Sequence, residues 1–353
     1  MIVTAETVLP AADFDAALAY FMHELQFRVE QISPADSPVT AALSGHGLRV
    51  RLEKDYTGAP GVLRLAVPAS EVRPAVTAPN GTRVEFVDAD PPVIIPDLKP
   101  ELVVTRFARD AAWHSGRAGL QYRDLIPSRL GGRFIASHIR ISGGGPVPDY
   151  THFHKIRFQM IHCVNGWIRV AYEDQGESFV MQAGDCVLQP PRIRHRVMEA
   201  SAGAAVVEIA CPAEHETRAD WSMPLPRPAG DLRRRYGGQL FVRHEAAKTP
   251  WAPWRAAGFE ARDLGIGAAT DGLAGARVVR AKGATSIPAS THDAEFQFFF
   301  LQQGRATLAC EGEHALQAGD ACVIPAGKRF GFEAASPDLE ILEVTLPALP
   351  AYR

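Results

Sequence analysis

Three histidines in two short segments form the strongest candidate for a chemical site. His152 and His154 are one residue apart, and His195 follows further along the chain, after Pro190-Pro-Arg-Ile-Arg. Side chains alternate along an extended strand, so His152 and His154 project to the same face. Neutral imidazoles are suitable ligands for one divalent transition metal (Fe, Mn, Ni, Cu or Zn), and three of them leave positions open for water or substrate. The pattern therefore predicts an open metal site.

Two further side chains lie close to this pattern. Gln159, five residues after His154, can return to the histidine face after a bend and offer an amide oxygen as fourth ligand. The alternative is a polar core residue that hydrogen-bonds a water on the metal. Arg157 is expected to share the inward face with Gln159, where it could bind a substrate carboxylate or enolate through both guanidinium nitrogens. A solvated arginine at the barrel rim is the equally simple alternative.

The two segments resemble the paired motifs of the cupin superfamily. The first motif holds Gly, His-x-His, an acidic residue and Gly; here Gln159 stands at the acidic position and Gly166 follows at the usual spacing. The second holds Gly, Pro and His, matched by Gly184, Pro190 and His195, although Arg192 replaces a glycine. The resemblance implies a jelly-roll barrel in which both motifs meet on facing strands. It also implies a metal held by His152, His154, Gln159 and His195.

The second half of the chain repeats the first. The segment 159–166 is echoed by 297–304, and Gly184–Pro190 is echoed by Gly319–Pro325. So long a period indicates a duplicated domain rather than a solenoid. In this alignment His154 falls on His292, but His152 falls on Ser290 and His195 falls on Phe330. We therefore expect the second copy to bind no metal.

Many short runs of β-branched and aromatic residues, separated by Gly, Pro, Asn and Asp, indicate a mainly β fold. Cupins are double-sheet jelly rolls. We expect a metal-binding barrel over 99–225 and a degenerate barrel over 226–353. Proline-rich stretches at 90–100 and 223–230 are the expected joints, because proline favours extended backbone and cannot donate to a sheet.

Residues 1–98 have a different pattern. Asp13 precedes apolar residues at helical spacing, which predicts a capped helix, and strand-like runs lie on both sides of it. This βαβββ order resembles one module of the glyoxalase/bleomycin-resistance (vicinal oxygen chelate) family, with a shortened second module after Gly61. Glu6 and Glu53 stand near the metal-ligand positions of that family, but no histidine joins them. The resemblance thus implies an α+β domain that shapes, covers or dimerises the protein.

The composition excludes several classes of partner. The 353 residues carry a net charge of −3, with 46% hydrophobic and 22% charged residues. No basic surface for nucleic acid or membrane is expected from this balance, and the N-terminal residues do not read as a signal peptide. Five cysteines without metal-type spacing favour reduced thiols and a cytoplasmic location. Pairing of exposed sheet edges would make the protein a homodimer.

The favoured hypothesis is a metal-dependent bicupin enzyme that acts on a small enol, catechol or dicarbonyl metabolite in the first barrel. The motifs resemble those of quercetin and gentisate dioxygenases, which implies an oxygenase that brings substrate and O2 together at one metal. A non-oxidative isomerase, lyase or hydrolase would need a general base near the metal, and we expect no inward carboxylate there. A third hypothesis is a sensor protein that binds a small molecule.

Overall fold

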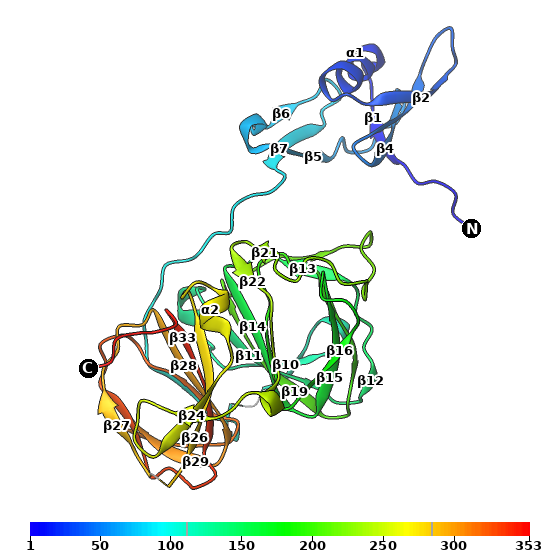
Figure 1. The fold of residues 1–353 in the computed structure, drawn as a ribbon. Helices are drawn as coiled ribbons and strands as arrows, with labels where there is room; N and C mark the ends of the chain where they lie inside the picture. The colour runs from blue at the N-terminus through cyan, green and yellow to red at the C-terminus, as the bar shows by residue number, and fades with distance from the viewer. Residues whose placement is uncertain (111, 284) are drawn as a thin grey trace. The chain divides into compact units, whose positions relative to one another are not determined.

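The computed structural model describes residues 1–110, 112–283 and 285–353, and the chain divides into two compact units, Met1–Pro92 and Val93–Arg353. Figure 1 shows the ribbon coloured along the chain. Strands dominate the second unit, so the mainly β fold expected from the sequence is confirmed. Within the described residues, no helix has the length and apolar character needed to cross a membrane.

The first unit begins with the expected βαβββ order. The side chain of Asp13 accepts a hydrogen bond of 3.2 Å from the backbone N–H of Ala16, which confirms the predicted helix cap. Helix α1 continues directly into the π-helical turn η1, and both bury apolar residues against the sheet β1-β4-β3-β2. These elements are β1 (Thr7–Pro10), α1 (Phe14–Ala19), η1 (Tyr20–Glu24), β2 (Arg28–Ser33), β3 (Thr40–Gly45) and β4 (Leu48–Glu53).

A smaller sheet of order β5-β7-β6 completes this unit. Its elements are β5 (Val62–Val67), η2 (Ala69–Glu71), β6 (Val76–Thr77) and β7 (Arg83–Asp88). The Glu6 carboxylate forms ion pairs with Arg49 and Arg51, and the hydrogen bond from Arg51 is the main cause that lowers the pKa of Glu6. Glu53 lies 3.9 Å from Arg51. Both glutamates therefore face arginines rather than histidines.

The second unit contains two β barrels, the first largely green and the second yellow to red in Figure 1. The larger sheet of the first barrel has the order β23-β17-β14-β19-β11-β10-β9, and the smaller has the order β16-β15-β18-β13-β20, with β12 beside β18. The strands of the larger sheet are β9 (His114–Ser115), β10 (Gln121–Asp124), β11 (Ile135–Ile141), β14 (Phe158–Asn165), β17 (Cys186–Leu188), β19 (Ala204–Cys211) and β23 (Val242–His244). The strands of the smaller sheet are β12 (Gly145–Pro146), β13 (His152–His154), β15 (Trp167–Tyr172), β16 (Phe179–Gln182), β18 (His195–Ala200) and β20 (Thr217–Ala219).

The second barrel repeats this arrangement, with a larger sheet β24-β25-β26-β33-β28-β31-β8 and a smaller sheet β27-β32-β29-β30. Its larger sheet consists of β8 (Val103–Thr105), β24 (Ala252–Pro253), β25 (Phe259–Asp263), β26 (Gly275–Ala281), β28 (Phe296–Gln303), β31 (Ala321–Val323) and β33 (Glu340–Leu346). Its smaller sheet consists of β27 (Ile287–Ser290), β29 (Arg305–Ala309), β30 (Glu313–Gln317) and β32 (Phe330–Glu333). Short connecting elements are η3 (Arg117–Gly119), η4 (Arg129–Gly131), β21 (Arg235–Tyr236), β22 (Gln239–Leu240), η5 (Ala246–Lys248) and α2 (Ile266–Ala269).

Each larger sheet ends on a strand from the other half of this unit. β8 precedes the first barrel in the chain but pairs with β31 of the second barrel. β23 follows the first barrel's other strands, beyond residue 225, and pairs with β17 of the first barrel. The two barrels are thus joined by exchanged strands as well as by packing.

The two larger sheets also face each other across a shared apolar core. Along β14, Phe158 and Met160 point into this core, where residues of both barrels meet. The rings of Phe134 and Phe296 stack across it with centroids 4.2 Å apart. Because side chains alternate, Gln159 and Ile161 of β14 point the other way, into the first barrel. This alternation fixes which residues of β14 can reach a site inside that barrel.

Candidate metal centre

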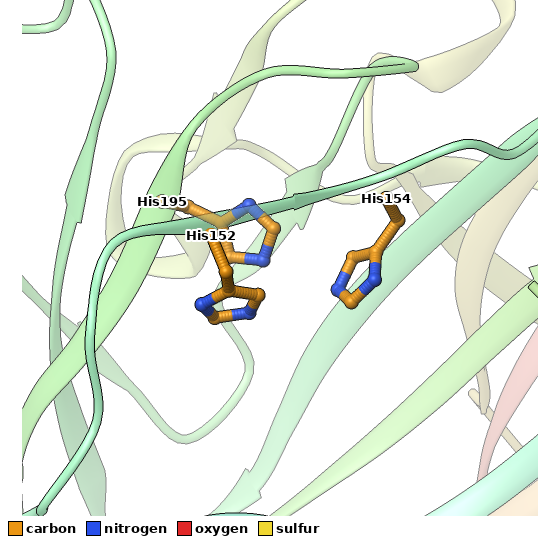
Figure 2. Close-up of side chains that lie close together, drawn as sticks. All are labelled: His152, His154 and His195. Carbon is orange, nitrogen blue, oxygen red and sulfur yellow. The ribbon is translucent and has the colours of Figure 1, made fainter. Parts of the chain in front are cut away.

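The three motif histidines converge inside the first barrel. β13 pairs antiparallel with β18 so that His152 lies opposite His195, and alternation brings His154 to the same face. One ring nitrogen of each histidine lies within 4.8 Å of the others, and the three rings gather in one region in Figure 2. The side chains of all three residues are buried. Among the described residues, no other group of three or more His, Cys, Asp or Glu comes this close together.

Hydrogen bonds orient each ring from behind. Nδ1 of His152 lies 2.8 Å from the carbonyl oxygen of Tyr150, and Nδ1 of His195 lies 3.0 Å from that of Ile193. Nδ1 of His154 lies 3.0 Å from the hydroxyl of Thr217. An Nδ1–H donated to a carbonyl leaves Nε2 as the free lone pair, which is the arrangement that supports metal ligation in proteins.

Burial also sets the charge of the rings. Desolvation is the main cause that lowers the pKa of His152, His154 and His195 below the ordinary value for histidine. The rings are therefore neutral near pH 7, and neutral imidazole is the form that binds metal. Three buried, oriented, neutral imidazoles could hold a single divalent transition metal.

Gln159 lies in the same cavity, as the sequence predicts, but both ends of its amide have partners. Its Nε2 donates to a carboxylate oxygen of Glu208 at 2.6 Å, and its Oε1 accepts from Nε2 of Gln189 at 3.2 Å. Gln189 in turn lies 3.2 Å from Nε2 of His195. Gln159 is thus connected to the triad through Gln189, and its role as a fourth ligand stays a prediction.

Arg157 lies elsewhere, and the expectation that it shares the inward face with Gln159 is wrong. β14 begins at Phe158, so the alternation of the strand does not extend back to Arg157. The guanidinium instead forms a two-pronged ion pair with Glu295 of the second barrel, with its closest contact at 2.8 Å, and Arg133 pairs with the same carboxylate. In this position Arg157 joins the barrels.

Sequence reasoning missed a buried carboxylate, Asp149, and a partly exposed arginine, Arg117, beside the triad. Arg117, in η3, forms an ion pair with Asp149 and lies 2.8 Å from Nε2 of His152. Asp149 also accepts hydrogen bonds from the backbone N–H groups of Tyr150 (2.8 Å) and Val197 (2.9 Å). The position of Asp149, three residues before His152, was a usable signal, whereas Arg117 comes from a distant loop.

The cavity at the triad is apolar on most of its walls. Aliphatic side chains from both sheets line it, and Arg117, Tyr122, Gln159 and Glu208 are among its polar lining residues. The aliphatic lining includes Ile139, Ile141, Ile161, Ile168, Val170 and Val206. Such a lining suits a small ligand with an apolar body and a polar head.

Glu208 corrects a second expectation, that the barrel interior offers no carboxylate. It lies on β19, opposite Ile161 of β14, so its side chain faces the cavity. A single charged residue within the apolar run Ala204-Ala-Val-Val-Glu208-Ile-Ala-Cys is the signal that could have found it. Charged side chains on the inward face of a barrel are rare unless they have a partner or a function.

Comparisons with known proteins agree with this architecture. The family model described as the cupin domain matches residues 276–345, which lie in the second barrel. A solved structure of oxalate decarboxylase from Bacillus subtilis is similar with a TM-score of 0.53 and 13% sequence identity, covering 74% of this chain and 80% of that chain. The B. subtilis enzyme contains Mn(II) centres. A search of curated protein sequences gives no match.

Salicylate 1,2-dioxygenase from Pseudaminobacter salicylatoxidans is similar to the same degree. Its TM-score is 0.53 at 14% identity, and the match covers 74% of this chain and 90% of that chain. At these identities the likeness shows the fold, which is that of two cupin barrels. The likeness of residues 1–98 to the vicinal oxygen chelate family stays a prediction.

Proposed function

We propose that this protein is a metal-dependent enzyme that acts on a small organic molecule in the first barrel. The observation that carries the proposal is the convergence of three buried, neutral imidazoles, each held at Nδ1, in a largely apolar cavity. In each ring Nδ1 already has a backbone carbonyl or a hydroxyl as its partner, which is the usual arrangement of histidines that bind a metal through Nε2. The expected homodimer and cytoplasmic location remain predictions.

Within this class we propose an oxygenase that acts on an enol, catechol or dicarbonyl compound. A bound divalent metal would supply a site at which substrate oxygen and O2 bind together. The chain itself would contribute three tasks. His152, His154 and His195 hold the metal without adding negative charge, Arg117 attracts an anionic oxygen of the substrate, and the aliphatic walls exclude bulk water.

A non-oxidative isomerase, lyase or hydrolase is the second candidate, and Glu208 favours it. Such chemistry needs a general base near the bound substrate, and the Glu208 carboxylate lines the same cavity as the triad. The sequence predicted no inward carboxylate that could act as this base, and Glu208 could fill that role.

Metal analysis and oxygen consumption test the proposal in sequence. Protein purified without chelators should carry about one transition metal per chain. Protein loaded with iron, manganese, nickel or copper is then assayed with an oxygen electrode against small enols, catechols and dicarbonyls. Oxygen uptake supports the oxygenase, and substrate conversion without oxygen uptake supports the second candidate. Binding of a metabolite without any conversion would favour the sensor instead, and protein that never binds metal would refute both enzymes.

A further inference from the structure

Each barrel contains an inward-facing glutamine–glutamate pair, and only in the second barrel is the carboxylate fully buried. In the first barrel Nε2 of Gln159 donates to Glu208 at 2.6 Å, and in the second Nε2 of Gln297 donates to Glu343 at 2.9 Å. The strand registers agree, because Glu208 lies opposite Ile161 and Glu343 lies opposite Phe299, each two residues after its glutamine. The pair therefore occupies the same position in both copies.

In the second barrel the carboxylate is enclosed by the protein. Arg277 and Arg255 form ion pairs with Glu343 at 3.2 and 3.5 Å, and the hydroxyl of Tyr352 donates to it at 3.2 Å. Glu343 is fully buried, and both of its oxygens have partners among these groups and Gln297. A ligand could not reach this carboxylate without displacing an arginine.

The residue opposite this carboxylate on the neighbouring strand differs between the two copies. Arg277 lies opposite Glu343 on β26, whereas Ser137 lies opposite Glu208 on β11. The short hydroxyl leaves a second, polar cavity that adjoins the cavity of the triad. Glu208, Tyr122, Arg117 and His154 line both cavities. Glu208 thus stands between the metal site and this second cavity, and it accepts a hydrogen bond from the neutral amide of Gln159.

We propose that Glu208 is a specificity-determining residue that accepts a hydrogen bond from a hydroxyl group of the substrate. This inference rests on the proposed function, because it requires a substrate whose other oxygen lies at the triad. A compound with two neighbouring oxygens, one anionic and one carrying a proton, fits both partners at once. A compound that lacks the donor would leave a desolvated carboxylate beside its apolar ring, which binding sites reject strongly.

The test compares catechol with phenol, which lacks the second hydroxyl, on zinc-loaded protein. Zinc is not redox-active, so the ligands stay intact, and calorimetry gives both dissociation constants. Catechol also chelates metals by itself, so the informative quantity is the preference for catechol over phenol in each variant. We expect Glu208→Ala to reduce this preference about 10- to 100-fold, the value of a hydrogen bond to a charged group. Glu199→Ala, which removes a partly exposed carboxylate paired with Arg169, is the matched control and should leave the preference unchanged.

A second variant tests the same inference from the other side. Ser137→Arg copies the residue that seals the second barrel, so it should abolish catechol binding while zinc content stays at the wild-type level. The inference is overturned if wild-type protein binds both ligands and Glu208→Ala keeps the preference, or if Ser137→Arg keeps catechol affinity. Loss of zinc in Glu208→Ala would also overturn it, by making the carboxylate a metal ligand. If wild-type protein binds neither ligand, the proposed substrate class fails and the inference falls with it.

Discussion

Lowering the pH should reduce the free energy of unfolding through His162, a histidine that is not part of the metal site. His162 of β14 is fully buried between the barrels, and its Nε2 lies 2.8 Å from Oε1 of Gln302 on β28. Its Nδ1 is buried without a hydrogen-bond partner among the described residues. The pKa of His162 is lowered from 6.5 to about 4, mainly by desolvation; the hydrogen bond with Gln302 offsets part of this shift, and His244 and Arg262 contribute to it. A proton on this ring would therefore be unfavourable in the folded protein.

The sign and size of the effect follow from this shift. The unfolded chain takes up a proton near pH 6.5, whereas the folded chain resists it until about pH 4. Between these pH values the unfolded state binds more protons than the folded state. The contribution of His162 to the free energy of unfolding is therefore fully present above pH 6.5 and is lost as pH falls toward 4. The loss is about 2 kcal/mol between pH 7 and pH 5 and about 3 kcal/mol in total.

His162→Gln should remove this loss, because glutamine can still donate to Gln302 but does not titrate. The assay is urea unfolding of metal-free wild type and variant at several pH values between 4.5 and 7.5. We expect the stability difference between the two proteins to change by about 2 kcal/mol from pH 7 to pH 5, in favour of the variant at low pH. The other buried histidines titrate in both proteins and cancel in this difference. Parallel pH profiles would refute the reasoning.

Three further outcomes are expected. His195→Ala should weaken metal binding at least 100-fold, whereas His23→Ala, which changes an exposed histidine, should not weaken it. Metal content is measured in both variants after dialysis, and equal metal occupancy would show that the ligand assignment is wrong. Asp149→Asn should weaken metal binding about 10- to 100-fold, because Asp149 helps to hold His152 and the backbone at Val197 in place. Competition with a chromophoric chelator measures this affinity, and an unchanged affinity would contradict the role of Asp149. Glu343→Gln should lower the free energy of unfolding by about 3 kcal/mol, because Arg255 and Arg277 lose their counter-charge. Chemical denaturation measures this loss, and a loss below about 0.5 kcal/mol would show that these ion pairs do not stabilise the fold.

The triad was predictable because the positions of its histidines follow from the spacing of residues within short segments. The spacing of His152 and His154 fixes their common face, and the turn before His195 fixes the third position once the two motifs share a barrel. The helix cap at Asp13 was predictable for the same reason, since the cap and the amide that it accepts lie three residues apart.

The remaining features of the site depend on contacts between distant segments. Arg157 seemed to continue the pattern of β14, but the strand starts one residue later and Glu295, far along the chain, attracts the guanidinium. Arg117 reaches the triad from a loop that precedes the first motif. Glu208 stands out as the single charged residue of β19, but which face of the strand it occupies depends on the register with β14, which the sequence does not give.

The exchanged strands have a consequence for synthesis of the chain. β8 leaves the ribosome before any strand of the first barrel, yet its partner β31 is made more than two hundred residues later, as the contact of Thr105 with Ala321 shows. Conversely, the larger sheet around the triad lacks its outer strand until β23 has emerged. The first barrel can therefore complete this sheet once β23 is made, whereas β8 stays without its partner until β31 has been synthesised, so a nascent chain holds an open sheet edge that invites chaperones.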